Sequence, residues 1–174
     1  MAFAKQFQLL APKIHANKMF DCGHDEMNVF LRRYADKNRV LGLSSTWVLP
    51  EESDNKNEQK MKLGAYYTLA SSTVRQELIP FDKKLPAYSV PVVLLARIAV
   101  DKHYQKQGLG AKTLITALRK AVELTEKGLP ALGVVLDVLD DNAWSFYQRF
   151  DAFQPFTNNP MRLFISVQVI KQLG

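Results

Sequence analysis

Apolar positions between residues 92 and 127 change from a strand pattern to a helix pattern within a few residues. Residues 92–100 form a nearly unbroken apolar run, interrupted by Arg97, which predicts a buried strand. After a short polar segment, apolar side chains recur at helical spacing from about residue 108 to 127, with charged residues on the other faces. This helix is expected to end at Gly128 and Pro130. The pattern therefore predicts a strand, a glycine-bearing turn and a long amphipathic helix in succession.

The same alternation of hydrophobic and polar positions predicts the remaining elements. Strands are expected at 7–10, 46–49, 63–74, 132–139 and 163–169, and further helices at 25–38 and 142–150. The polar stretch 51–60 predicts a surface loop, and the prolines between residues 75 and 91 predict an ordered loop outside the sheet. Pro155 and Pro160 are expected to bracket a turn. Without repeats or linkers, residues 1–174 are expected to form one α/β (α+β) domain.

The turn before the long helix has the sequence Gln105-Lys106-Gln107-Gly108-Leu109-Gly110. Backbone N–H groups at a helix start lack intrahelical partners and can hold phosphate oxygens, and glycine permits close approach of a ligand. The turn lacks the third glycine of a dinucleotide fingerprint and the Gly-Lys-Ser/Thr ending of a nucleotide P-loop. An ordinary strand–helix connection remains the alternative at this level.

Composition limits the classes of protein that fit the chain. Hydrophobic residues make up 47% and charged residues 23% of 174 residues, which is typical of a globular protein. We expect no membrane span and no secretory signal, because no apolar run is long enough. Cys22 is the only cysteine and the three histidines show no paired ligand spacing, so we expect a cytoplasmic protein without a metal.

The net charge of +6 is unevenly distributed along the sequence. Basic residues gather in two segments, Arg32 to Arg39 and Lys102 to Lys120. Such clusters fit an RNA backbone or the phosphates of a cofactor, and they also fit a solvated surface. Charge alone therefore leaves nucleic-acid binding open.

The spacing Gln-x-x-Gly-x-Gly after a strand ending Arg97-Ile98-Ala99-Val100 resembles the acetyl-CoA loop of the GNAT acetyltransferase superfamily. The resemblance implies the GNAT fold, with a mixed, mostly antiparallel central sheet that is flanked by helices and splays open between strands 4 and 5. Acetyl-CoA would lie in that opening, its pantetheine amides bonded by the backbone of the motif strand and its pyrophosphate by the turn. The implied cofactor-binding residues are Ile98, Ala99, Val100, Gln105, Lys106, Gln107, Gly108, Leu109, Gly110, Ala111 and Asn142.

Tyr147 occupies the position at which this superfamily carries a tyrosine that points at the acetyl-CoA sulfur. Acetyl transfer to an amine expels CoA as a thiolate, and a neighbouring general acid lowers the cost of that charge. A tyrosine is protonated at neutral pH and suits this role. We therefore expect Tyr147 to be the general acid, the alternative being an aromatic residue of the core. No residue is nominated as general base, since water or a backbone carbonyl can serve an aminoacyl ester amine.

Further segments resemble the GNAT toxins of type II toxin–antitoxin modules. They are Phe20-Asp21-Cys22-Gly23 with the following residues to Leu31, Ala65-Tyr66-Tyr67-Thr68-Leu69-Ala70, the motif strand, and Phe146-Tyr147-Gln148-Arg149-Phe150. The resemblance implies acetylation of the α-amino group of aminoacyl-tRNA, which blocks translation. It also implies homodimerisation and a partner antitoxin, commonly of the ribbon–helix–helix type. The segment Phe150-Asp151-Ala152-Phe153 departs from the family, which usually has a glycine after the helix.

Basic residues become candidates for the tRNA path under this reading: Arg32, Arg33, Lys37, Arg39 and Arg97. A solvated helix face is an equally good explanation of each residue taken singly. Three other functions stay open: a GNAT enzyme acting on a small amine or a protein N-terminus, a non-catalytic acyl-CoA-binding module, and a plain nucleic-acid-binding protein.

Overall fold

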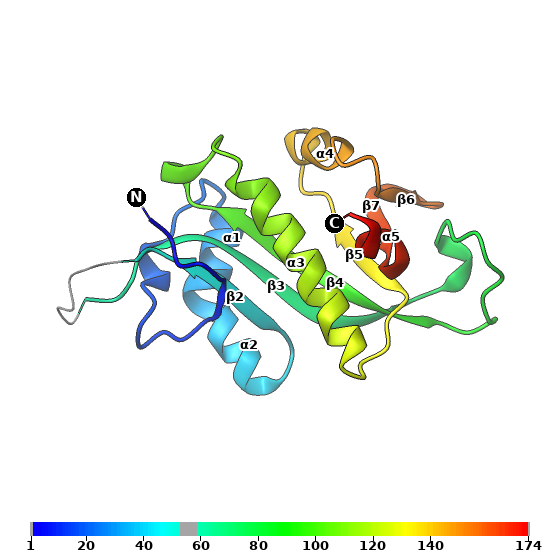
Figure 1. The fold of residues 1–174 in the computed structure, drawn as a ribbon, viewed down its shortest axis with the longest axis horizontal. Helices are drawn as coiled ribbons and strands as arrows, with labels where there is room; N and C mark the ends of the chain where they lie inside the picture. Colours follow the sequence, from blue (N-terminus) through cyan, green and yellow to red (C-terminus); the bar gives the residue numbers. More distant parts are fainter. Residues whose placement is uncertain (1, 53–58, 174) are drawn as a thin grey trace. The chain divides into compact units, whose positions relative to one another are not determined.

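The computed structural model describes residues 2–52 and 59–173, which form an α/β fold (Figure 1). Within these residues the strands pair in the order β1-β2-β3-β4-β5-β7-β6. The strands are β1 (Gln8–Leu9), β2 (Ser45–Pro50), β3 (Leu63–Val74), β4 (Val90–Val100), β5 (Gly133–Asp137), β6 (Gln154–Phe156) and β7 (Asn159–Ser166). The helices are α1 (Asp25–Val29), α2 (Ala35–Leu41), α3 (Leu109–Glu126), α4 (Asp141–Gln148) and α5 (Val167–Gln172). The expected mixed, mostly antiparallel sheet flanked by helices is confirmed.

The chain divides into two compact units, each assembled from two stretches of sequence. The first unit comprises Met1–Ala70 and Arg97–Ala117, and the second comprises Ser71–Ala96 and Leu118–Gly174. β3, β4 and α3 therefore contribute residues to both units.

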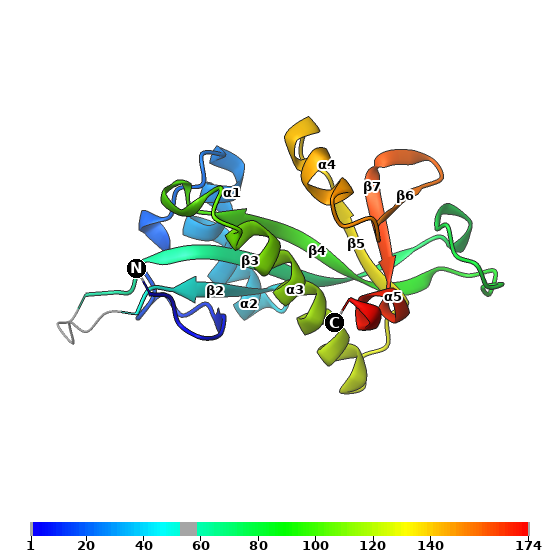
Figure 2. The same cartoon turned by 45° about the horizontal axis from the view of Figure 1, so that its top comes forward.

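The sheet of the first unit carries a separate hydrophobic cluster on each face, because side chains alternate along a strand. Val48 and Tyr66 belong to the cluster that also includes residues of the segment from α1 to α2. Their neighbours Leu49 and Ala65 pack instead with Leu109, at the start of α3. Figure 2 shows these helices on the two sides of β2 and β3. The apolar positions recognised in the sequence thus place the start of α3 against one face of the sheet.

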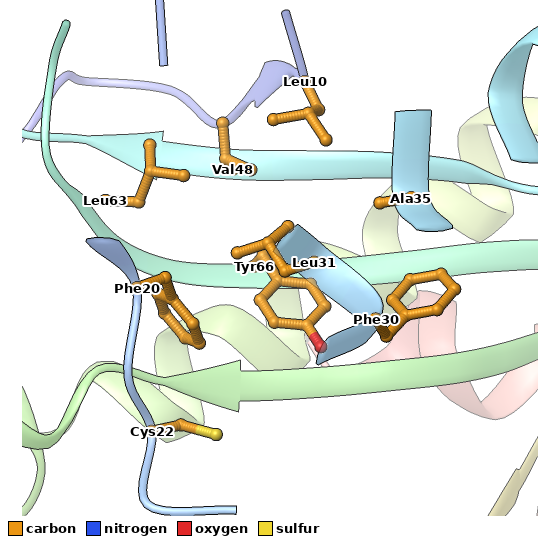
Figure 3. Close-up of a cluster of buried hydrophobic side chains, with 9 residues drawn as sticks. All are labelled: Leu10, Phe20, Cys22, Phe30, Leu31, Ala35, Val48, Leu63 and Tyr66. Carbon is orange, nitrogen blue, oxygen red and sulfur yellow. The ribbon is translucent and has the colours of Figure 1, made fainter. Parts of the chain in front are cut away.

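Tyr66 lies at the centre of the larger cluster, between Phe20 and Phe30 (Figure 3). Its ring makes an edge contact with Phe20 at 5.3 Å between centroids and stacks on Phe30 at 6.5 Å. Its hydroxyl donates to the carbonyl oxygen of Met27 at 2.8 Å, which satisfies the one polar group of this buried side chain. Burial raises the pKa of the Tyr66 phenol. The cluster therefore fixes the chain before α1 and the helical segment against β3.

The helical segment predicted at 25–38 extends to Leu41 and contains a π turn at Phe30–Tyr34, between α1 and α2. A π turn has no distinct sequence pattern, so the periodicity indicated a single continuous helix. Gly42 ends the segment with a left-handed φ of 78°, and the Leu43 N–H donates to the Asn38 carbonyl at 2.8 Å. This glycine-terminated helix end is three residues beyond the predicted one.

The second unit is organised around β5, whose central residues Val134, Val135 and Leu136 are fully buried. β5 pairs in parallel with β4 at Val93↔Val134 and Leu94↔Val135 and antiparallel with β7 along its whole length. The parallel ladder is short although both strands run on beyond it. Such a short ladder is the feature expected of a sheet that opens between these two strands.

The predicted end of the last strand was wrong. Residues 167–169, predicted as the end of the last strand, form the start of α5, because the Ser166 side chain accepts from the Val169 N–H at 3.1 Å and caps the helix. Pro155 in β6 and Pro160 in β7 lie on either side of the turn at 157–158, so the prediction that they bracket a turn is confirmed. β6 is an edge strand, where a missing backbone N–H is tolerated.

One loop prediction was wrong, and another falls mostly outside the described residues. Pro91, expected outside the sheet, lies in β4, and its carbonyl accepts from the Leu132 N–H at 2.9 Å. The predicted polar loop 51–60 includes residues 53–58, which lie outside the described residues. Glu51 at its start is 8% exposed and accepts a hydrogen bond from the Tyr104 hydroxyl.

Candidate functional site

The turn between β4 and α3 adopts the conformation that its sequence predicts. Lys106 and Gly108 both have left-handed φ values, 63° and 83°. A Cβ atom at Gly108 would meet nothing within 4 Å, so the glycine is required for its backbone conformation and leaves open space at the head of α3. Glycine at this position therefore permits a ligand to approach the backbone.

The first residues of α3 present unpaired backbone donors to this open space. The Lys112 N–H is the first to find a helical acceptor here, the Gly108 carbonyl at 3.2 Å. The preceding N–H groups of Leu109, Gly110 and Ala111 have no intrahelical partner, as in any first helical turn. Free N–H groups and the positive end of the helix dipole are the features that favour an anion at a helix start. The predicted glycine-bearing turn is present, and phosphate binding by residues 105–111 stays a prediction.

The side chain of Gln105 is used inside the protein. Its Nε2 donates to the carbonyl oxygens of Cys22 and Val100, both at 2.9 Å. The sequence assigned Gln105 to cofactor binding. In the structure its side-chain amide instead links the start of the turn to the segment at Cys22 and to the end of β4 at Val100. Its backbone still belongs to the turn, so its contribution to cofactor binding is to position the residues that follow.

Asp21 connects the Phe20-Asp21-Cys22-Gly23 segment to the same turn. Its Oδ2 lies 3.0 Å from the Lys102 Nζ, and its backbone carbonyl accepts from the Lys102 N–H at 2.8 Å. Its Oδ1 accepts from the Gly23 N–H and from the Asn28 side chain, both at 2.9 Å. The hydrogen bond from Gly23, followed by those from Lys102 and Asn28, holds the pKa of the Asp21 carboxyl well below its usual range.

Asp101 completes this network at the end of β4. Its side chain is buried and accepts from the backbone N–H of Asp21 at 3.1 Å and of His103 at 3.0 Å. The same carboxylate contacts the His103 Nδ1 at 2.7 Å. Asp21 and Asp101 were not singled out from the sequence, although Asp21 lies inside a recognised motif. Asp101 is the last residue of the segment from Leu95 to Asp101 that resembles the toxins, but no role was assigned to it.

The end of β4 lies directly before this network. Ala99 packs against the cluster around Tyr66, and Val100 packs against the cluster on the opposite face, with Leu109. Ile98, Ala99 and Val100 are all half-buried. The Val100 carbonyl already accepts one hydrogen bond from Gln105, which leaves its second lone pair for a ligand.

Tyr147 lies in α4, in the second unit. Asp140 caps the start of this helix, because its side chain accepts a hydrogen bond from the Ala143 N–H at 2.8 Å. The tyrosine is 5% exposed, and its ring makes edge contacts with Phe146 and Phe153. No other residue in the described parts of the chain hydrogen-bonds to its hydroxyl. Burial raises the pKa of the Tyr147 phenol, so the hydroxyl keeps its proton at neutral pH.

A cavity of about 360 Å³ lies beside Tyr147, and we call it the α4 cavity. Its lining comes from α4, the following turn, β6 and β7: Trp144, Tyr147, Gln148, Asp151, Phe153, Pro155 and Leu163. Asp151 has a left-handed φ of 48°, at the turn where the resembling family usually has a glycine. Aspartate is among the few other residues that adopt this conformation readily, which explains the departure. Asn142, another predicted cofactor contact, is exposed in the first turn of α4.

The predicted tRNA-contacting residues fall into two groups. Arg32 donates to the Phe20 carbonyl at 2.6 Å through Nη2 and at 3.1 Å through Nε, and Arg39 pairs with Asp36 at 3.1 Å. Arg97 pairs with Glu26 at 2.8 Å, and its guanidinium lies 4.9 Å from the centre of the Phe30 ring. Arg33 and Lys37, by contrast, have exposed side chains. The two residues are four positions apart in the sequence.

Neither a metal centre nor a membrane-spanning helix emerges from residues 2–52 and 59–173. No three histidine, cysteine or carboxylate side chains gather there in a way that could hold a metal ion. No helix in this part of the chain is long and apolar enough to cross a membrane.

A mixed sheet flanked by helices, with a glycine-bearing turn between β4 and α3, is the architecture that the sequence predicted for an acetyltransferase. The acetyltransferase (GNAT) family matches residues 16–152, and the chain belongs to this family. The resemblance found in the sequence is therefore confirmed.

Individual proteins of known activity or structure are similar to this chain. The chain is 30% identical over 157 residues to a tRNA-acetylating toxin of Mycobacterium tuberculosis, which covers 88% of this chain and 87% of that protein. AtaT complexed with acetyl-methionyl-tRNAfMet is similar with a TM-score of 0.83 and 24% identity, over 97% of this chain and 98% of that one. A tyrosine-to-phenylalanine mutant of AtaT, bound to the C-terminus of the antitoxin AtaR and acetyl-CoA, is similar with a TM-score of 0.80 and 22% identity. That match covers 99% of this chain and 98% of the AtaT chain. The solved structures share the fold of this chain.

Proposed function

We propose that this protein transfers the acetyl group of acetyl-CoA to the α-amino group of aminoacyl-tRNA and thereby blocks translation. The observation that carries the proposal is the open turn at residues 105–111, whose left-handed Gly108 exposes the first N–H groups of α3. Family membership and the tRNA-acetylating relative support it.

The cofactor is held mainly by backbone in this proposal. The N–H groups of the turn, from Lys106 to Ala111, bind the pyrophosphate, and the side chains of Lys106 and Lys112 add positive charge. Backbone groups of β4 at Ile98, Ala99 and Val100 bond the pantetheine amides. Asn142 makes a further cofactor contact from the first turn of α4. Because most of these groups are main-chain atoms, the network of Asp21, Asp101 and Gln105 has the task of holding them in place.

Tyr147 supplies the proton for the departing thiolate. The amine nitrogen attacks the thioester carbonyl carbon, the C–N bond forms and the C–S bond breaks, with its electron pair moving to sulfur. The Tyr147 hydroxyl donates its proton to that sulfur, while water or a backbone carbonyl takes the proton released by the amine. The raised pKa keeps the tyrosine in its acid form, and the absence of a competing hydrogen-bond partner among the described residues leaves the proton available.

The acceptor tRNA is attracted by the basic residues of the first unit. Arg33 and Lys37 are the strongest candidates for phosphate contacts, since both side chains are exposed. Arg32, Arg39 and Arg97 already make intramolecular bonds, so they contribute to the local potential and hold the helical segment. We further propose a homodimer, a cognate antitoxin of the ribbon–helix–helix type, and action in the cytoplasm, where aminoacyl-tRNA is found.

The direct test is incubation of total aminoacyl-tRNA with labelled acetyl-CoA and the purified protein, followed by mass spectrometry of the released aminoacyl-adenosine. We expect an acetylated α-amino group. Turnover on a small amine or a protein N-terminus, with no label on any aminoacyl-tRNA, would reject the substrate and keep the enzyme class. Acetyl-CoA binding without any turnover would identify a non-catalytic acyl-CoA-binding module.

A further inference from the structure

A second cavity, of about 400 Å³, lies at one edge of the sheet in the first unit, and we call it the Glu51 cavity. Three neighbouring strands contribute to its lining at their ends, since Glu51 follows β2, Leu63 begins β3 and Asp101 follows β4. The Asp101 N–H donates to the Gly64 carbonyl at 2.8 Å, which holds the end of β4 beside the start of β3. The volume falls in the range of small-ligand pockets, roughly 300–1,000 Å³.

The body of the Glu51 cavity is apolar. Phe20 and Leu63 line it and are 1% and 3% exposed, so they form its floor. The Tyr104 ring forms a wall, and an edge contact with Phe3 at 5.0 Å between centroids fixes its position. Met19 also lines the cavity but is 64% exposed, so it lies on the open side. Because a methionine side chain adapts its shape to its neighbours, the cavity suits a small apolar body.

Glu51 is the unusual member of this lining, because carboxylates are seldom so buried without a cationic partner. The residue is 8% exposed, and one of its side-chain oxygens accepts a hydrogen bond from the Tyr104 hydroxyl. The other oxygen accepts from no donor in residues 2–52 and 59–173, and no cationic side chain in these residues pairs with the carboxylate. A buried charge without compensation is costly, and a ligand that brings a positively charged donor removes that cost.

Two basic residues also line the cavity, but neither neutralises Glu51. The His103 Nδ1 contacts the Asp101 carboxylate at 2.7 Å, and the histidine side chain is 71% exposed. Lys62 is exposed as well, and charges in contact with water are screened. Asp101 is already satisfied, because it also accepts from two backbone N–H groups. The acceptor with an open position in the cavity is therefore Glu51.

We propose that the Glu51 cavity binds a small organic cation, namely a primary ammonium group on a short aromatic body, and that this cation regulates acetyl-CoA binding. The ammonium group donates to the second oxygen of Glu51 and lies beside the Tyr104 ring, whose π face attracts a cation. The aromatic body covers the apolar floor. Anions are disfavoured by the two carboxylates, so the cavity differs in its chemistry from the proposed phosphate site at residues 105–111.

Tyr104 links the cavity to the turn that precedes α3. Its side chain packs in the hydrophobic cluster that contains Leu109, the first residue of α3, and it directly precedes Gln105. The open cavity and the formed turn belong to one conformation of the first unit. A ligand that binds this conformation increases its population, so it favours any other ligand that needs the same conformation. The cation and acetyl-CoA are therefore expected to strengthen each other's binding.

The binding test uses benzylamine, which is protonated at neutral pH, and its uncharged counterpart benzyl alcohol, each titrated into the full-length protein by NMR. We expect a Kd on the order of 1 mM for benzylammonium, as fits a ligand of about eight non-hydrogen atoms. Benzyl alcohol should bind at least about 10-fold more weakly, because it lacks the charged donor. Equal affinities of the two compounds, or no benzylammonium binding at about 10 mM, would overturn the assignment.

Two neighbouring carboxylates provide matched variants. Glu51→Gln removes the charge and keeps an acceptor for the Tyr104 hydroxyl, whereas Glu52→Gln removes the same charge from an exposed side chain next to it. We expect benzylammonium to bind at least about 10-fold more weakly to Glu51→Gln and with parental affinity to Glu52→Gln. Equal weakening in both variants would reveal a general attraction of the surface for cations and contradict the site.

The regulatory link rests on the proposed cofactor site, and titration of acetyl-CoA with and without saturating benzylammonium tests it. We expect the acetyl-CoA Kd to fall by about 5-fold, and the benzylammonium Kd to fall by the same factor when acetyl-CoA is present, because such coupling is reciprocal. An acetyl-CoA Kd that benzylammonium leaves unchanged would overturn the link. Absence of acetyl-CoA binding under either condition would instead reject the proposed function, while benzylammonium binding to the parent protein and to Glu51→Gln still tests the cavity.

Discussion

The side-chain amide of Gln105 donates a hydrogen bond to the backbone carbonyl of Cys22 at 2.9 Å. This bond joins two motifs that are more than eighty positions apart in the sequence and that were recognised independently. One is the segment from Phe20 to Gly23 and the other is the phosphate-binding turn. Asp21 and Asp101 reinforce the same connection. The first motif therefore fixes the backbone of the turn that we propose binds the cofactor.

Loss of the Gln105 amide should weaken acetyl-CoA binding without unfolding the protein. Gln105→Ala removes two hydrogen bonds, one part-buried and one exposed, each worth about 0.5–1.5 kcal/mol, and it frees the turn. We expect the acetyl-CoA Kd to rise by roughly 5- to 100-fold in calorimetry. Gln172→Ala, an exposed change in α5, is the control. An unchanged Kd for Gln105→Ala would show that the turn holds its conformation unaided.

Gly108 and Gly128 form a matched pair at the two ends of α3. Both have left-handed φ values, 83° and 111°, and a Cβ atom would meet nothing within 4 Å at either site. Gly108→Glu and Gly128→Glu should therefore cost similar backbone strain, about 1–2 kcal/mol. Only Gly108→Glu places an anion at the phosphate site, so it alone should abolish acetyl-CoA binding in calorimetry. Equal affinities of the two variants would remove the turn from the cofactor site.

Arg33 and Lys37 should account for part of the salt dependence of tRNA binding. Replacing both by glutamine removes two exposed charges, and each lost phosphate contact lowers the slope of log K against log salt by about 1. Lys83 and Lys84, exposed in the second unit, provide the control double variant. Filter binding over a salt series measures the slopes. Identical slopes for the two double variants would place the tRNA path elsewhere.

Asp21 should make stability depend on pH in the acid range. Its folded-state pKa lies below that of the unfolded chain, so the unfolded state binds more protons and the stabilisation is present above about pH 4. It is lost as the pH falls below that value toward the folded pKa. Relative to Asp21→Asn, the protein should thus be more stable at pH 6 and lose this advantage on acidification. A difference in denaturation midpoint that stays constant from pH 6 to pH 2 would contradict this role.

The sequence predicted the elements that follow strong periodicity and missed those that depend on single side-chain bonds. The glycine-bearing turn and α3 were predicted because glycine placement and apolar spacing both act locally. The role of Gln105 depends on Cys22, a contact that no local pattern encodes. The end of β7 was mistaken because Val167 and Val169 favour strands, whereas the Ser166 cap starts a helix there. The sequence also showed that no glycine follows α4, where the family usually has one. The left-handed φ of Asp151 explains how the chain makes this turn without a glycine.

The central claim is that Tyr147 protonates the thiolate during transfer to aminoacyl-tRNA. The most direct measurement is single-turnover acetyl transfer to aminoacyl-tRNA by the parent protein and Tyr147→Phe, with exposed Tyr88→Phe as control. The phenylalanine keeps the ring contacts, so Tm and acetyl-CoA affinity should stay close to the parent. The chemical step should slow by about 10²–10⁴-fold in Tyr147→Phe alone. Full-rate transfer by Tyr147→Phe would contradict the account.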